Sequence, residues 1–155
     1  MTTKEIYELS GEINDRLNDY RNDMASAIIT LMNERVVNKI DLRKMREDCK
    51  KMGLLDVAER IEHIVNKHIV RIKYGETHEC YIDRVIIRDL GFVECVCSDV
   101  KDPGFEIADS VRFLDIYTIM SVMELVAEYF DFMDEIASKK ITTQRPPCFG
   151  VAAGV

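Results

Sequence analysis

The longest apolar segment of the chain runs from Val111 to Ala137 and reads VRFLDIYTIMSVMELVAEYFDFMDEIA. At about 100° per residue, apolar side chains cover most of the circumference of a helix with this sequence. The pattern therefore predicts a long helix that must be covered from several directions. We expect a second copy of the chain to supply part of that cover, through an interface of Ile116, Ile119, Val122, Met123, Val126, Tyr129, Phe130 and Met133.

The same helix also carries a narrow acidic stripe. Residues three or four apart lie on one face of a helix, and four carboxylates share this spacing. One interpretation is the solvated edge of a largely buried helix. The other is a docking strip for lysine or arginine side chains from a basic protein surface. The stripe consists of Glu124, Glu128, Asp131 and Glu135.

The N-terminal segment predicts a second long helix. Thr2 and Glu5 have the spacing of a capping box, which marks a helix start. Apolar residues then recur mostly at spacings of four and three, which predicts an amphipathic helix to about Val37. Such a helix can pair within a bundle or with another chain. Its apolar positions are Ile6, Ile13, Leu17, Tyr20, Met24, Ala27 and Leu31.

Two shorter helices follow in the middle of the chain. Asp41 is suited to cap a second helix, and Gly53 ends it. A third helix opens at Asp56, and its apolar stripe continues to Gly75. A strand over residues 69–74 is the alternative, because that segment is rich in β-branched residues.

The remaining segments predict a hairpin, the long helix and a tail. Residues 79–98 are dense in β-formers around the turn signal Asp89-Leu90-Gly91, which predicts a β-hairpin. Asp109 or Ser110 is the expected N-cap of the long apolar helix. Residues 141–155 contain Pro, Gly and Ala without a period, and we expect a flexible C-terminal tail.

Together these elements predict a mainly α fold. We expect a bundle of about four helices with one inserted β-hairpin at about 79–98, in a single domain of residues 1–140. An α+β arrangement of winged-helix type is the alternative. The order of a helix pair joined at Gly53, a hairpin and a long apolar helix is found in winged-helix regulators, which is an analogy of fold alone.

Composition and charge narrow the possible partners. The 155 residues are 47% hydrophobic and 32% charged, as in a soluble globular protein, and the formal net charge is −7. A protein with a net negative charge does not attract the negatively charged phosphate backbone, so on this ground we do not expect nucleic acid as a partner. Charged residues interrupt the N-terminus where a secretory signal is apolar, and no apolar run reaches the roughly 20 residues of a membrane span. We expect a cytoplasmic protein without a membrane partner.

The best metal candidates are His78, Cys80, Cys95 and Cys97. Zinc needs its ligands within about 2.0–2.3 Å of one point. A turn at Leu90-Gly91 leaves more than about 10 Å along the strands between Cys80 and Cys97. We therefore expect these cysteines to be buried, reduced thiols, and we expect no metal and no cofactor.

No catalytic constellation is visible in the sequence. His68 lies on an apolar stripe, which indicates a core residue rather than a general base. We therefore expect a non-enzymatic interaction or regulatory protein that acts through helical surfaces as a homodimer or higher oligomer. Its size, charge and tail would suit an accessory protein of a virus or mobile element. The alternatives are a winged-helix-type nucleic-acid-binding regulator, and a metal-dependent or thiol enzyme that uses His78, Cys80, Cys95 and Cys97.

Overall fold

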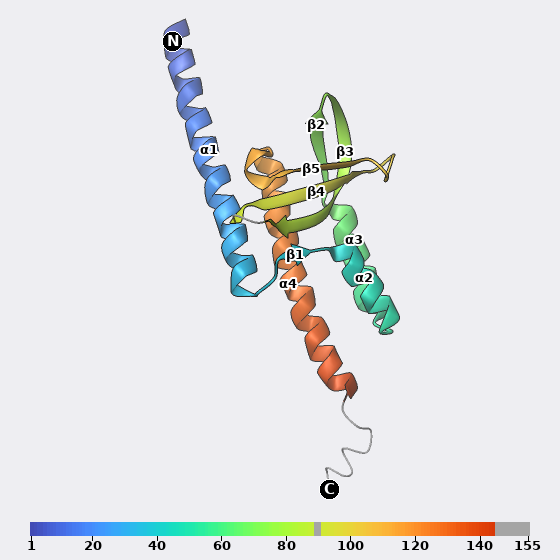
Figure 1. Ribbon diagram of the computed structural model, residues 1–155. Coiled ribbons are helices and arrows are strands. Elements are labelled where there is room, and N and C mark those ends of the chain that lie inside the picture. The colour runs from blue at the N-terminus through green and yellow to red at the C-terminus, as the bar shows by residue number, and fades with distance from the viewer. Residues whose placement is uncertain (89–90, 145–155) are drawn as a thin grey trace.

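The computed structural model describes residues 1–88 and 91–144, and this part of the chain is a mixed α+β domain. Within it, four α-helices pack with a five-stranded antiparallel sheet (Figure 1). The mainly helical character is confirmed, whereas the bundle is a correction, because the helices pack on a sheet. The elements are α1 (Thr3–Glu34), β1 (Lys39–Ile40), α2 (Leu42–Lys51), α3 (Leu55–Lys67), β2 (Ile69–Tyr74), β3 (Glu76–Ile87), β4 (Val93–Asp99), β5 (Glu106–Ser110), a 3₁₀ turn (Val111–Phe113) and α4 (Ile116–Gln144).

Helix α1 begins with the capping box that the sequence predicts. The Thr2 hydroxyl accepts a hydrogen bond from the Glu5 amide at 3.1 Å, and the Glu5 carboxylate accepts one from the Thr2 amide at 3.2 Å. The helix ends at Glu34, slightly earlier than expected, because the chain turns at Val36, whose φ is +55°. Only the C-terminal third of α1 reaches the core, and the rest projects away from the domain (Figure 1).

Helices α2 and α3 form the expected helix pair. The start of α2 agrees with the prediction, whereas α3 ends earlier than predicted. Asp41 caps α2 by accepting a hydrogen bond from the Lys44 amide at 3.0 Å, and Gly53 turns the chain with a φ of +80°. Helix α3 stops at Lys67, so the extension of this helix to Gly75 was wrong. Residues 69–74 form β2 instead, since their β-branched side chains alternate between buried and exposed positions along β3.

The predicted hairpin is confirmed as β3 and β4, within a larger sheet. The strand order is β1-β3-β4-β5, and β2 pairs with β3 along the edge that β1 also uses. Asp109 and Ser110 lie in β5, which was not predicted, so neither caps the long helix. Asp115 has that role, because its carboxylate accepts hydrogen bonds from the Thr118 amide at 3.0 Å and from the Thr118 hydroxyl at 2.8 Å.

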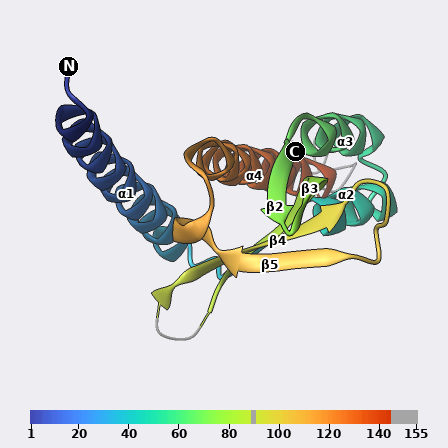
Figure 2. The same ribbon diagram turned by 90° about the horizontal axis from the view of Figure 1, so that it is seen from above.

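Helix α4 is the centre of the fold. Together with α3 it lies on one side of strands β4 and β5, and it also contacts α1 (Figure 2). The helix continues to Gln144, so positions 141–144 belong to it rather than to the expected tail, whose remaining residues 145–155 lie outside the described residues. In the described part of the chain, we find no helix with the length and apolarity of a membrane span. The fully buried side chains of α4 are Ile119, Val122, Leu125 and Val126.

Candidate interaction surfaces

The apolar surface of α4 is covered by its own chain to a greater extent than the sequence suggested. α1, α3 and the sheet all contact this helix. The argument that a single copy cannot hide these side chains therefore fails for half of the expected interface. Four of its residues are buried, namely Ile119, Val122, Val126 and Phe130, and four are half-buried, namely Ile116, Met123, Tyr129 and Met133.

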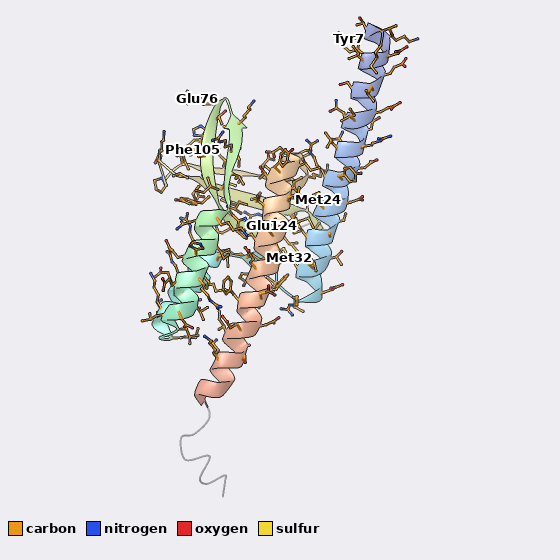
Figure 3. The ribbon with its side chains drawn as sticks, turned by 180° about the vertical axis from the view of Figure 1, so that it is seen from behind. Tyr7, Met24, Met32, Glu76, Phe105 and Glu124 are labelled. Carbon is orange, nitrogen blue, oxygen red and sulfur yellow. The ribbon has the colours of Figure 1, made fainter. Side chains whose placement is uncertain are left out.

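Two of the four carboxylates in the acidic stripe of α4 form ion pairs with α3 and the residue that ends it, within the same chain. The Glu128 carboxylate lies 2.7 Å from His68 Nε2 and 3.5 Å from Lys67 Nζ. Glu135 forms an ion pair with Arg60. The basic groups that a docking strip would take from a partner are thus supplied within the chain. The other two carboxylates, on Glu124 and Asp131, are exposed and make no ion pair with a described residue (Glu124 is labelled in Figure 3).

His68 is a structural residue. It is only 3% exposed, it ends α3, and its ring nitrogen is held by Glu128. This arrangement confirms the interpretation of His68 as a core side chain.

The four metal-ligand candidates His78, Cys80, Cys95 and Cys97 do not meet at one point. His78 lies beyond the end of β4, where its Nδ1 is 2.5 Å from the Asp99 carboxylate and its ring stacks on Phe105. Cys80 lies opposite Asp99 in the β3–β4 register, while Cys97 lies opposite Ile82. No group of three or more His, Cys, Asp or Glu side chains within residues 1–88 and 91–144 could hold a metal ion.

The described cysteines are buried free thiols. Burial raises the pKa of the Cys80 thiol to about 11, and burial also raises the pKa of Cys49. The pKa of Cys95 is raised well above its ordinary value by its hydrogen bond to Cys97, whose Sγ is 3.6 Å away, and by burial. Because a thiolate is the nucleophile and the metal ligand, these residues are poorly suited to either chemistry at neutral pH.

The arginines of the helix pair are engaged with carboxylates of the same chain. Arg46 contacts Glu47 and Glu62, and Arg60 contacts Glu135. A helix that reads a DNA groove keeps such side chains free for bases and phosphates. These pairings weigh against the winged-helix interpretation of function.

The projecting part of α1 carries a line of uncovered apolar side chains. Residues 3–16 are all exposed, and Ile6, Ile13 and Tyr20 keep 54%, 47% and 55% of their surface in water. In Figure 3, Tyr7 marks the free end, while Met24 and Met32 lie where α1 runs beside α4. We call the free apolar line the α1 seam, made of Ile6, Leu9, Ile13, Leu17 and Tyr20.

The α1 seam was visible in the sequence, but its exposure was not. The pattern showed an amphipathic helix and left open whether it pairs within the chain. In the structure, the body of the domain contacts a neighbouring line, Ala25, Ile28 and Met32, near the end of the helix. That line differs from the seam, of which Ile6, Leu9, Ile13 and Tyr20 are exposed and Leu17 is half-buried.

A groove between α2 and α4 forms a second candidate surface. Its cavity volume is about 480 Å³. Sequence reasoning missed this groove, because the two helices that form it are far apart along the chain. The apolar floor comes from Met45, Cys49, Met52, Tyr129, Met133 and Ile136, and the rim from Lys39, Asp41, Lys44, Asp48, Ala137 and Lys140.

No protein-family model, curated protein or solved structure matches this chain.

Proposed function

We propose that this protein is a non-enzymatic interaction protein that works as a homo-oligomer and makes contact through α1. The observation that supports this proposal is the α1 seam, an apolar line on a helix that stands clear of the domain (Figure 1). A contiguous exposed apolar surface on a small domain is typical of a protein–protein contact. The burial of the described thiols and the pairing of His68 and His78 with carboxylates favour an interaction role over catalysis.

The exposed fractions set the scale of the association. Full burial of a large apolar side chain contributes about 1.5–3 kcal/mol, and roughly half of the surface of Ile6, Leu9, Ile13 and Tyr20 is still exposed. Burying four of them therefore gains about 3–6 kcal/mol per contact. Association costs about 4–15 kcal/mol in lost freedom, so one contact alone binds weakly and a second contact in the same assembly strengthens it. The affinity should be micromolar or weaker.

The experiment is sedimentation velocity over roughly 1–200 µM, a range that brackets the affinity expected above. The wild-type chain should shift from monomer to oligomer with concentration, and Ile13→Glu should abolish the shift. Tyr7→Glu is the matched control, because Tyr7 is 74% exposed on the same helix but lies about 120° around it from Ile13. A wild-type monomer at every concentration would overturn the proposal, and so would equal effects of the two variants.

A further inference from the structure

The groove between α2 and α4 is shaped to receive a helix. Its α4 wall runs from Tyr129 to Lys140 and its α2 wall from Asp41 to Met52. The end residues of each wall are therefore eleven positions apart, which is about 16 Å at 1.5 Å per residue. Both walls use residues about three or four apart along their helices, which is the pattern of a groove that accepts an amphipathic helix.

The α1 seam matches the groove in length. Ile6 and Leu17 of the seam are also eleven helical positions apart, or about 16 Å. It presents aliphatic side chains, and the groove floor offers three methionines, which adapt readily to the shape of a partner.

Charge favours the same match. Among the rim residues, Lys44 pairs with Asp48, while Lys39 and Lys140 form no ion pair with any described residue. The free part of α1 is acidic, so it would bring carboxylates to these lysines. Over residues 3–19 it carries Glu5, Glu8, Glu12, Asp15 and Asp19 against Lys4 and Arg16.

The chain's own seam cannot fill its own groove. The C-terminal third of α1 is anchored against the core, and the free end points away from the lower halves of α2 and α4 (Figure 1). A continuous helix cannot fold back on itself, so the occupant must come from another copy.

We propose that the α1 seam of one copy docks in the α2–α4 groove of a second copy. This inference rests on the proposed self-association and specifies its interface. The contact joins two different surfaces, so it either closes as a reciprocal pair, in which each copy donates α1 to the other, or continues as an open chain. In the reciprocal pair the second contact forms within an existing complex, which strengthens the first.

The test uses two variants that each remove one side of the contact. Ile13→Glu places a charge in the seam and leaves the groove intact. Ala137→Glu places a charge in the groove, at an exposed position, and leaves the seam intact. Each variant alone should be monomeric by sedimentation velocity. An equimolar mixture should form a dimer, because the intact seam of one variant meets the intact groove of the other. This single-contact dimer should dissociate at a concentration roughly a hundredfold or more above that of a closed wild-type dimer.

Two controls keep the comparison specific. Ala127→Glu places the same substitution at another exposed position of α4 that does not line the groove, and it should associate like the wild type. Met52→Glu blocks the groove from α2, where the side chain is 38% exposed, and it should reproduce the effect of Ala137→Glu.

The outcomes separate the two proposals. If the groove variants associate like the wild type while Ile13→Glu is monomeric, the seams pair with each other or the groove serves a small ligand. That result would refute the docking proposal and leave the proposed self-association through α1 supported. A mixture that associates no more than either variant alone, at the highest concentrations reached, also overturns the docking proposal. A wild-type chain that is monomeric at all concentrations would refute both the proposed self-association and the docking proposal.

Discussion

The acidic stripe of α4 supports a quantitative prediction, because its carboxylates have different environments on one helix. Glu128 holds the buried ring of His68 at 2.7 Å and also contacts Lys67. Glu124, one turn earlier, is exposed and forms no ion pair with a described residue. Glu128→Ala and Glu124→Ala are therefore the same substitution on the same helix face, with and without a buried partner.

The expected free energies follow from these contacts. Removing Glu128 leaves a His68 ring nitrogen buried without its partner, which costs about 1–3 kcal/mol. Removing Glu124 should change the free energy of unfolding by no more than about 0.5 kcal/mol. Glu135→Ala should fall between them, at about 0.2–1 kcal/mol, because its ion pair with Arg60 is partly exposed to solvent.

The assay is urea unfolding together with thermal melts of the three variants. At about 2–4 °C per kcal/mol for a domain of this size, Glu128→Ala should lower Tm by roughly 2–12 °C. The double variant with His68→Ala should cost less than the sum of the single variants, since the removed groups interact. Equal losses for Glu124→Ala and Glu128→Ala, or additive costs in the double variant, would refute the assignment of His68 and Glu128 as a coupled pair.

The buried thiols give two further predictions, and the cap of α4 gives a third. In a Cys148→Ser background, the native protein should react slowly with a thiol reagent at pH 8 and fully after denaturation, and rapid native labelling would contradict the raised thiol pKa values. Because the pKa of Cys80 is raised from 9.0 to about 11 in the folded state, stability should fall as pH rises through this range, which urea titrations at pH 8, 9 and 10 can measure. Asp115→Ala should cost about 0.5–2 kcal/mol of unfolding free energy through the lost helix cap, whereas Asp109→Ala should be near neutral, and the reverse order would show that the cap is misassigned.

Local signals in the sequence predicted much of the fold. The capping box of Thr2 and Glu5, the cap at Asp41 and the turn at Gly53 each depend on neighbours within a few residues, so they could be recognised without tertiary information. The β3–β4 hairpin was found for the same reason, because its strands are adjacent in the chain.

Long-range pairing accounts for what the sequence did not reveal. Residues 69–74 continue the apolar stripe of the preceding helix, which favoured a helix in the sequence, and only their pairing with β3 makes them a strand. The expected interface on α4 failed in part because Ile119 and Val126 are covered by segments distant in sequence. The α2–α4 groove depends on the same kind of packing, so no local pattern could have shown it.

The way α1 is held at one end has a consequence for backbone amide hydrogen exchange. An isolated helix is marginal in water, and the outer turns of α1 gain support only from the capping box and from propagation out of the anchored end. The rate of amide exchange should therefore fall steadily from Ile6 towards Ile28, because the amides near the anchored end of α1 open least often. Contact with another copy should flatten this gradient, so the protection profile of a single helix can report assembly.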